Sequence, residues 1–427
     1  MASLTTFSNA MKTKFIGPIR DNLSSNKVLL YGMRTRDEDK KSALPQGSRE
    51  FRGIEASADG IDFVGNEFRI PLRSSRNQGT GFRSENVPLP AAGNQGYLQI
   101  TEPMRYAYGT FNITGQLLKA SESQEGAFRK AVTAEMRGLV DDLKRHTNIA
   151  GYGTGTGVIA TVTTGVASAT QAIDTSRYLA GGEFVDIYDS TLTTYRGTVA
   201  HEVVSIVRGA SPTVTFAASV TTTTNDVLIR ASSSSTTSAP NNDKNVAVTG
   251  LEKIVDSTGV LHGLNPATAG QGFWAATELP VAGAIVGDDK LRELFDGIGI
   301  ESGDDEDLIL ITTRGIRKRY ANTLTAFKRF NDEKSMTLRG GFKAILFDDT
   351  PMVVDDHCPT GVIWALNTDA LFWSQMSDWE WLEEDGTVLK HVTGFDKYEA
   401  HLFKYLNLGT WARNRHGKIT GAADDQR

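Results

Sequence analysis

Two β-type segments joined by an irregular loop constrain this chain more than any other feature of its sequence. Within residues 53–118, apolar and polar residues alternate before the loop and again after it. The apolar positions are Ile61, Phe63, Phe68, Ile70 and Leu72 before it, then Leu98, Ile100, Tyr106, Tyr108, Phe111 and Ile113. The loop has about twenty residues rich in Gly, Asn and Pro, a length that compact domains rarely leave irregular without a functional role or a partner. We predict a long two-stranded hairpin.

Charged side chains mark the same hairpin. Four arginines lie along it, flanked by two carboxylates: Arg69, Arg73, Arg76 and Arg83, with Glu67 and Glu85. Residues 1–52 before it hold ten Lys or Arg against five Asp or Glu. This composition predicts an extended arm with one short helix near Thr6–Met11, and a disordered tail is the alternative.

The clearest helix is predicted over residues 121–149. Its apolar residues recur every three or four positions, as on one face of a helix: Phe128, Val132, Met136, Leu139 and Leu143. Ser121 with Gln124 resembles a capping box, and Gly151 supplies the stop signal. The helix is expected to span about 24 residues of this segment, so at 1.5 Å per residue it would be about 36 Å long.

Residues 151–243 differ in composition from the rest. They contain no lysine, and 30 of the 93 residues are Ser or Thr. Four short strand candidates lie at 182–189, 195–209, 211–218 and 225–231. They predict a small β-barrel whose Ser/Thr-rich flanks, 221–224 and 232–238, are exposed connections. Residues 245–427 then mix helix and strand signals, so the chain as a whole is predicted to be α+β.

Composition limits the classes of function. Lys plus Arg is 45 against 51 Asp plus Glu, a formal charge of −6 that argues against a free-standing nucleic-acid binder. Cys358 is the one cysteine, which excludes intrachain disulfides and multi-cysteine metal sites. Neither a signal peptide nor an 18-residue apolar run is present, so we expect a soluble protein made in a cytoplasm.

No motif predicts a catalytic, metal or cofactor site. The glycines of 151–157 (GYGTGTG) lack the Lys-Ser/Thr ending of a phosphate loop and favour a turn into the barrel. Residues 355–358 (DDHC) are of metal-ligand types, but neighbours on an extended chain point to opposite faces, so an acidic turn is favoured. The run Asp304–Asp307 favours a solvated loop, and Trp373, Trp379 and Trp381 favour packing. We expect no enzyme.

The order of these parts resembles the major capsid proteins of tailed bacteriophages, which share the Hong Kong 97-type fold. The stretches that carry the resemblance are 1–23, 53–118, 121–149, 248–259, 307–330, 340–367 and 401–421. The resemblance implies the following division: arm 1–52, E-loop 53–118, spine helix of the P-domain 119–150, inserted β domain 151–243, mainly A-domain 244–370, and P-domain return strands with the C-terminus 371–427.

The resemblance also implies a function. Copies of the chain would form pentamers and hexamers of an icosahedral shell around packaged double-stranded DNA, assembled in the host bacterial cytoplasm and without a membrane. Portal, scaffold and decoration proteins are further possible partners, the scaffold as a separate protein. The hairpin arginines and glutamates would contact neighbouring subunits; the alternative is that the arginines only keep the loop soluble.

One departure from the family concerns whether the subunits of the shell are joined covalently. Some members join subunits through an E-loop lysine and a neighbour's asparagine, but no lysine lies between Lys41 and Lys119 here. We therefore expect a non-covalent shell. Two other hypotheses stay open, an encapsulin-like nanocompartment shell and a soluble enzyme with a β accessory domain.

Overall fold

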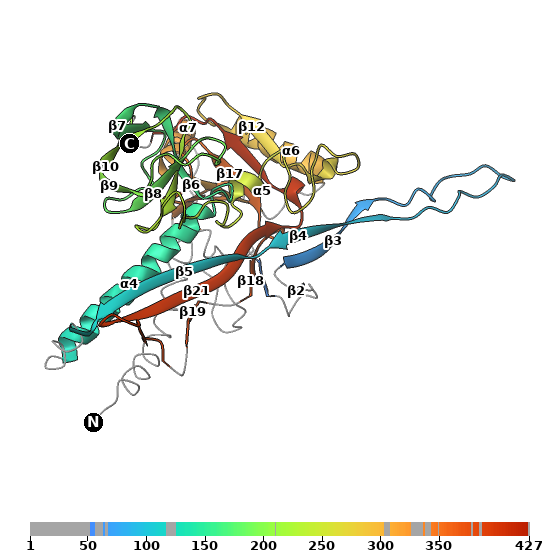
Figure 1. Ribbon diagram of the computed structural model, residues 1–427. Helices are drawn as coiled ribbons and strands as arrows, with labels where there is room; N and C mark the ends of the chain where they lie inside the picture. The colour runs from blue at the N-terminus through green and yellow to red at the C-terminus, as the bar shows by residue number, and fades with distance from the viewer. Residues whose placement is uncertain are drawn as a thin grey trace.

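A computed structural model describes most of the chain after the predicted arm (Figure 1). The described residues are 52–55, 63–64, 67–116, 125–209, 211–302, 308–325, 336–337, 343–348, 350–376, 379–383 and 387–425. The predicted arm lies outside them except for Arg52. The predicted capping box at Ser121 and Gln124 and the acidic run 304–307 also lie outside them.

A six-stranded sheet is built around strand β21, the longest strand of the described chain. β21 pairs antiparallel with β5 from Lys397 opposite Thr114 to Leu406 opposite Arg105. It also pairs with β18, β19 and β20, and β18 pairs in parallel with β1. The strands are β1 (Arg52–Glu55), β5 (Arg105–Thr114), β18 (Leu371–Gln375), β19 (Glu380–Trp381), β20 (Lys390–His391) and β21 (Lys397–Thr410).

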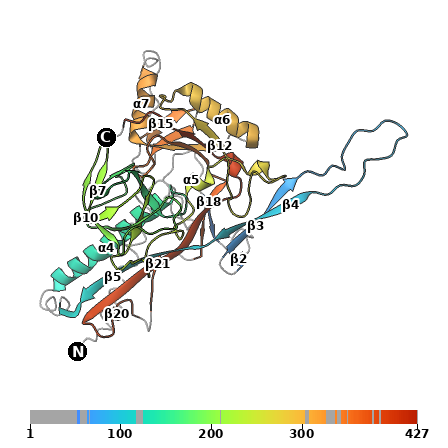
Figure 2. The same cartoon turned by 45° about the horizontal axis from the view of Figure 1, so that its top comes forward.

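Helix α4 (Glu125–Ala150) packs along β5 and β21 (Figures 1 and 2). Its 26 residues make it about 39 Å long. It begins four residues later than predicted and ends at Ala150, where the Gly151 amide donates to the Thr147 carbonyl at 2.9 Å. Met136 and Leu143 of the predicted face, together with Val140, are buried with Trp379 and Trp381 of the sheet. Packing of this apolar face holds the helix on the sheet.

The predicted hairpin differs from the observed one after Pro103. Strand β3 (Glu67–Ser75) pairs with β4 (Gly96–Pro103), but the second β segment divides at Met104 and continues as β5, whose partner is β21. Tyr106 and Tyr108 were placed on the apolar face with Phe111 and Ile113, and this was wrong. Side chains alternate across a strand, so the even-numbered tyrosines are exposed, whereas Gly109, Phe111 and Ile113 are buried.

A seven-stranded sheet with three helices forms the other part of the body. Its order is β12-β22-β17-β13-β16-β15-β14. The strands are β12 (Thr277–Pro280), β13 (Leu308–Thr312), β14 (Met336–Thr337), β15 (Lys343–Phe347), β16 (Thr350–Val354), β17 (Ile363–Asn367) and β22 (Gly417–Thr420). The helices of this part are α5 (Leu251–Ile254), α6 (Asp288–Ser302) and α7 (Arg314–Thr325), with 3-10 turns at Gly272–Trp274 and Arg413–Arg415. The mixture agrees with the α+β prediction.

Residues 158–231 form a closed barrel of six strands in the order β10-β7-β6-β11-β8-β9. The strands are β6 (Val158–Thr164), β7 (Ala167–Ile173), β8 (Phe184–Tyr188), β9 (His201–Val207), β10 (Thr213–Thr221) and β11 (Val227–Ala231). The last four match the strand candidates, but β6 and β7 were not among them. The chain leaves and returns side by side, because the Asn245 amide donates to Thr156 and the Leu251 amide to Gly151.

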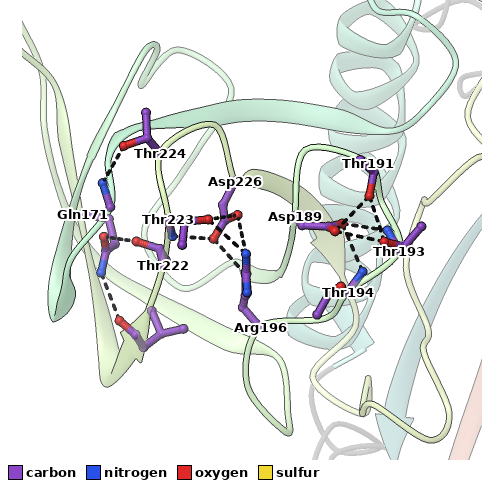
Figure 3. A network of polar contacts seen from close by, with 12 residues as sticks. Gln171, Asp189, Thr191, Thr193, Thr194, Arg196, Thr222, Thr223, Thr224 and Asp226 are labelled. Atoms are coloured by element: carbon purple, nitrogen blue, oxygen red, sulfur yellow. Dashed lines mark hydrogen bonds and ion pairs between the residues drawn. The ribbon is translucent and has the colours of Figure 1, made fainter.

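The Ser/Thr-rich flanks of the barrel are not simply exposed connections, as predicted. Thr222 is buried and donates to the Gln171 side chain at 2.7 Å (Figure 3). Thr223 binds Asp226, which also accepts two hydrogen bonds from Arg196 at 3.0 and 3.1 Å. Ser235 is fully buried and donates to Asp186. These hydroxyls satisfy buried polar groups, which explains their burial.

Arg413 joins the segment 253–274 to the turn between β21 and β22. Its side chain is fully buried and its guanidinium lies 3.4 Å from the Asp256 carboxylate. It donates to backbone carbonyls of a single segment, those of Lys253, Ile254, Thr258, Gly259 and Trp274. A planar guanidinium with five donors suits such a cluster, whereas a lysine ammonium does not.

We expect Arg413→Met to destabilise the unassembled chain by about 3 kcal/mol or more, because several buried carbonyls would lose their donors. The measurement is the free energy of guanidinium-induced unfolding. Arg415→Met is the matched control. Arg415 lies 4.9 Å from the Trp411 ring centre at a half-buried position, where such a contact contributes about 0.5–1 kcal/mol. Equal effects of the two substitutions would contradict this role of Arg413.

Candidate intersubunit surfaces

The β3–β4 hairpin projects far from the body of the molecule (Figures 1 and 2). Its strands pair from Glu67 opposite Pro103 to Ser75 opposite Gly96, with one register shift near the loop. Phe68 and Ile100 at its base are buried, whereas nearly every residue of the loop beyond Ser75 is exposed or half-buried. Within one subunit, the loop therefore has no surface against which to pack.

The structure does not bring the predicted charged contact residues together. Arg69 lies 3.6 Å from Glu67 on the same strand. Arg73, Arg76, Arg83 and Glu85 are exposed at separate positions along the hairpin and loop, and none forms an ion pair with another described residue. The Arg83 guanidinium donates to the Phe82 carbonyl. Their role as contacts between subunits stays a prediction.

Apolar residues of the loop were not among the predicted contact residues. Phe82 is fully exposed and Leu89 is 85% exposed, with Val87 half-exposed between them. The loop buries none of these three side chains, and neighbouring exposed apolar groups are typical of sites of protein contact. Their position in the long loop was a signal already visible in the sequence.

A buried acid lies at the base of the hairpin. The Glu102 carboxyl on β4 accepts a hydrogen bond from Ser374 on β18 at 2.7 Å, and its second oxygen has no partner among the described residues. Burial raises the pKa of Glu102 to about 8, although the Ser374 hydrogen bond opposes the shift. The side chain is therefore mostly a neutral acid at pH 7. It touches Gly409 of β21, where the carboxyl leaves no room for a Cβ.

The turn at residues 355–358 connects the barrel to the body. Asp355 is buried and accepts hydrogen bonds from Asn148 on α4 and from the His357 amide. Burial raises the pKa of Asp355, but these hydrogen bonds outweigh it and the net pKa is lowered. From the barrel, Arg177 and Tyr178 donate to the carbonyls of Cys358 and His357. The acidic turn is confirmed, and its contacts are structural.

The other described motifs are a buried thiol and a connecting segment. Cys358 is fully buried, and burial raises the pKa of its thiol well above the usual value. Residues 151–157 connect α4 to β6 as predicted, with positive φ angles at Gly155 and Gly157. In the described parts of the chain, no three His, Cys, Asp or Glu side chains gather as a metal site. No described helix is both long and apolar enough to cross a membrane.

Comparison with solved structures finds proteins similar to this chain, whereas comparison of its sequence does not. No protein-family model matches the sequence, and no curated protein matches it. The capsid asymmetric unit of cyanophage A-1(L) matches with a TM-score of 0.52 and 11% identity, over 87% of this chain and 90% of that one. The chain therefore has the fold of this capsid protein, and the Hong Kong 97-type fold predicted from the sequence is confirmed at this level.

Two further matches have lower TM-scores. The capsid of a native GTA particle matches with a TM-score of 0.43 and 12% identity, over 92% of this chain and all of that one. An encapsulin complex from Synechococcus elongatus matches with a TM-score of 0.42 and 9% identity, over 83% of each chain. The fold assignment rests on the cyanophage structure alone.

The protonated state of Glu102 predicts how stability depends on pH. Between pH 4.5 and about 8 the group is ionised in the unfolded chain and protonated in the folded one, so unfolding releases a proton. Its contribution is fully present below pH 4.5 and is lost as pH rises to about 8. Glu102→Gln removes this loss. Between pH 4.5 and about 8, the free energy of unfolding of the variant should therefore rise relative to that of wild type by about 1.4 kcal/mol per pH unit.

The measurement is the unfolding free energy of the unassembled chain at pH 5, 6 and 7. The matched control is Glu301→Gln, at an exposed position on α6, which should follow the wild-type profile. Parallel profiles for Glu102→Gln and wild type would show that Glu102 is ionised in the folded chain.

Proposed function

We propose that the chain is the major capsid protein of a tailed bacteriophage. Copies form pentamers and hexamers that close into an icosahedral shell around double-stranded DNA, in the host cytoplasm. The fold shared with the cyanophage A-1(L) capsid protein is the observation that carries the proposal. The hairpin supports it, because its exposed apolar loop and arginines need a surface that one subunit does not supply.

The divisions of the family are part of the same proposal. Residues 53–118 serve as the E-loop that lies over a neighbour, and α4 serves as the spine helix of the P-domain. The mainly A-domain segment is 244–370, the return strands follow at 371–427, and 1–52 is an arm that reaches another subunit. Portal, scaffold and decoration proteins are further partners. A structural role is favoured over a soluble enzyme because the fold match is to a shell protein.

Electron microscopy of the purified chain tests the proposal directly. Closed shells are expected, and a chain that stays monomeric under all assembly conditions would contradict it. Double-stranded DNA inside particles from infected cells is the result expected of a phage capsid. Particles that enclose protein cargo without nucleic acid would instead identify an encapsulin-like compartment.

Phe82→Ser should weaken assembly without changing the fold of the subunit, because Phe82 touches no buried core. If Phe82 fills a neighbour's pocket, the subunit concentration needed for assembly should rise about tenfold or more. Light scattering of an assembly titration measures it. Phe395→Ser, at an exposed phenylalanine outside the hairpin, is the matched control. An unchanged assembly threshold for Phe82→Ser would exclude the loop tip as an anchor.

Mature particles should dissociate into single chains on a denaturing gel. The hairpin has no lysine between Lys41 and Lys119, so the amine needed for an isopeptide bond to a neighbour is missing from it. Particles treated with an amine-reactive cross-linker give the positive control, a ladder of oligomers. A similar ladder from untreated particles would overturn the non-covalent shell.

A further inference from the structure

The outer face of β9 carries an uncharged stripe between two opposite charges. Val204 and Val207 are 58% and 59% exposed, and Ser205 between them is also exposed. Glu202 lies at the start of this run and Arg208 directly after its end, both exposed. We call Glu202, Val204, Ser205, Val207 and Arg208 the β9 stripe.

Strand pairing explains why the stripe faces outward. β9 shifts register against β10 between the pairs Ser205–Thr215 and Val203–Phe216. The shift lets two consecutive residues, Val204 and Ser205, face solvent, while Val203 stays in the barrel core. The stripe is thus a built feature of the strand.

The neighbours of the stripe widen its uncharged face. Thr213 lies beside Val207, Thr215 beside Ser205 and Phe184 beside Glu202, so no charged residue interrupts it. A surface that lacks lysine and has few charges at its centre is typical of protein interfaces. The 93 residues from 151 to 243 contain no lysine at all.

Several charged groups in or beside the barrel have partners within the chain. Arg196 pairs with Asp226, Glu183 with Arg145 of α4, and Asp243 with His146 of α4. Glu202 and Arg208, in contrast, form no ion pair or side-chain hydrogen bond with another described residue. The stripe therefore has an unpaired negative charge at one end and an unpaired positive charge at the other. A second copy of the stripe that runs in the opposite direction would place a charge of opposite sign at each end.

We propose that the β9 stripe binds the β9 stripe of a second copy across a two-fold axis. The axis passes near Ser205, so that Glu202 of each copy faces Arg208 of the other and the valines cover one another. Each two-fold contact therefore contains two equivalent ion pairs between Glu202 of one copy and Arg208 of the other. The inference rests on the proposed shell function and gives the barrel the role of joining subunits.

The position of the barrel makes this contact separate from the hairpin. Figures 1 and 2 show β10, the neighbour of β9, on the side of the molecule away from the β3–β4 hairpin. A subunit can therefore contact one neighbour through the hairpin and another through the barrel at the same time.

Cross-linking tests the axis directly. Two sheets stacked face to face lie about 10 Å apart, which is too far for a disulfide but within reach of a short bismaleimide reagent. Ser205→Cys should therefore give covalent dimers in assembled particles, and none in dilute subunits. Cys358 is buried and does not react first. Ser219→Cys, exposed on β10 outside the stripe, is the matched control and should stay monomeric.

Charge exchange tests the identity of the partner. Glu202→Arg or Arg208→Glu alone replaces two attractions by two repulsions in each contact, so the fraction of chains in particles near the assembly threshold should fall about threefold. The double exchange restores both pairs between identical copies and should recover assembly. Glu301→Arg, exposed on α6, is the control for the charge change.

The outcomes separate this inference from the proposed function. Wild-type chains that form no particles would refute the shell itself. Particles in which Ser205→Cys gives no dimers would refute only the barrel contact. Single exchanges that weaken the particles without recovery in the double exchange would assign the stripe to a different protein and so also overturn the contact.

Discussion

The antiparallel pairing of β5 with β21 is the constraint on which the rest of the structure depends. It joins two segments almost three hundred residues apart from Arg105 opposite Leu406 to Thr114 opposite Lys397. The buried side of the pair receives α4, and the end at Arg105 leads back through Met104 into the hairpin. Because β21 also pairs with β18, the direction of the hairpin is tied to the centre of the body.

Local patterns predicted the elements better than their partners. The period of 3.6 residues was enough for α4, because this signal lies within the helix itself. The pairing of β5 with β21 has no local signal, so the second β segment was assigned wholly to the hairpin. β6 and β7 were missed because Thr, Ser, Ala and Gln dilute their apolar alternation.

The same distinction between local signals and distant contacts applies to the candidate sites. The exposure of charged residues such as Arg76 and Arg83 was predictable, since a long loop rich in Gly, Asn and Pro lies at the surface. Glu102 and Arg413 were not, because their importance comes from burial against segments distant in sequence. Thr222 shows the same limit: a threonine run typical of a surface connection is partly buried once Gln171 accepts its hydroxyl.

The chain leaves the core for the barrel and returns to it at adjoining points, Thr156 beside Asn245 and Gly151 beside Leu251. A segment with adjoining ends can be gained, lost or exchanged as a unit during evolution, since the helix and sheets that flank it need not move. The core of the fold and the barrel can therefore have separate histories. The same opening offers a site at which a foreign domain with adjoining ends could be inserted into the chain.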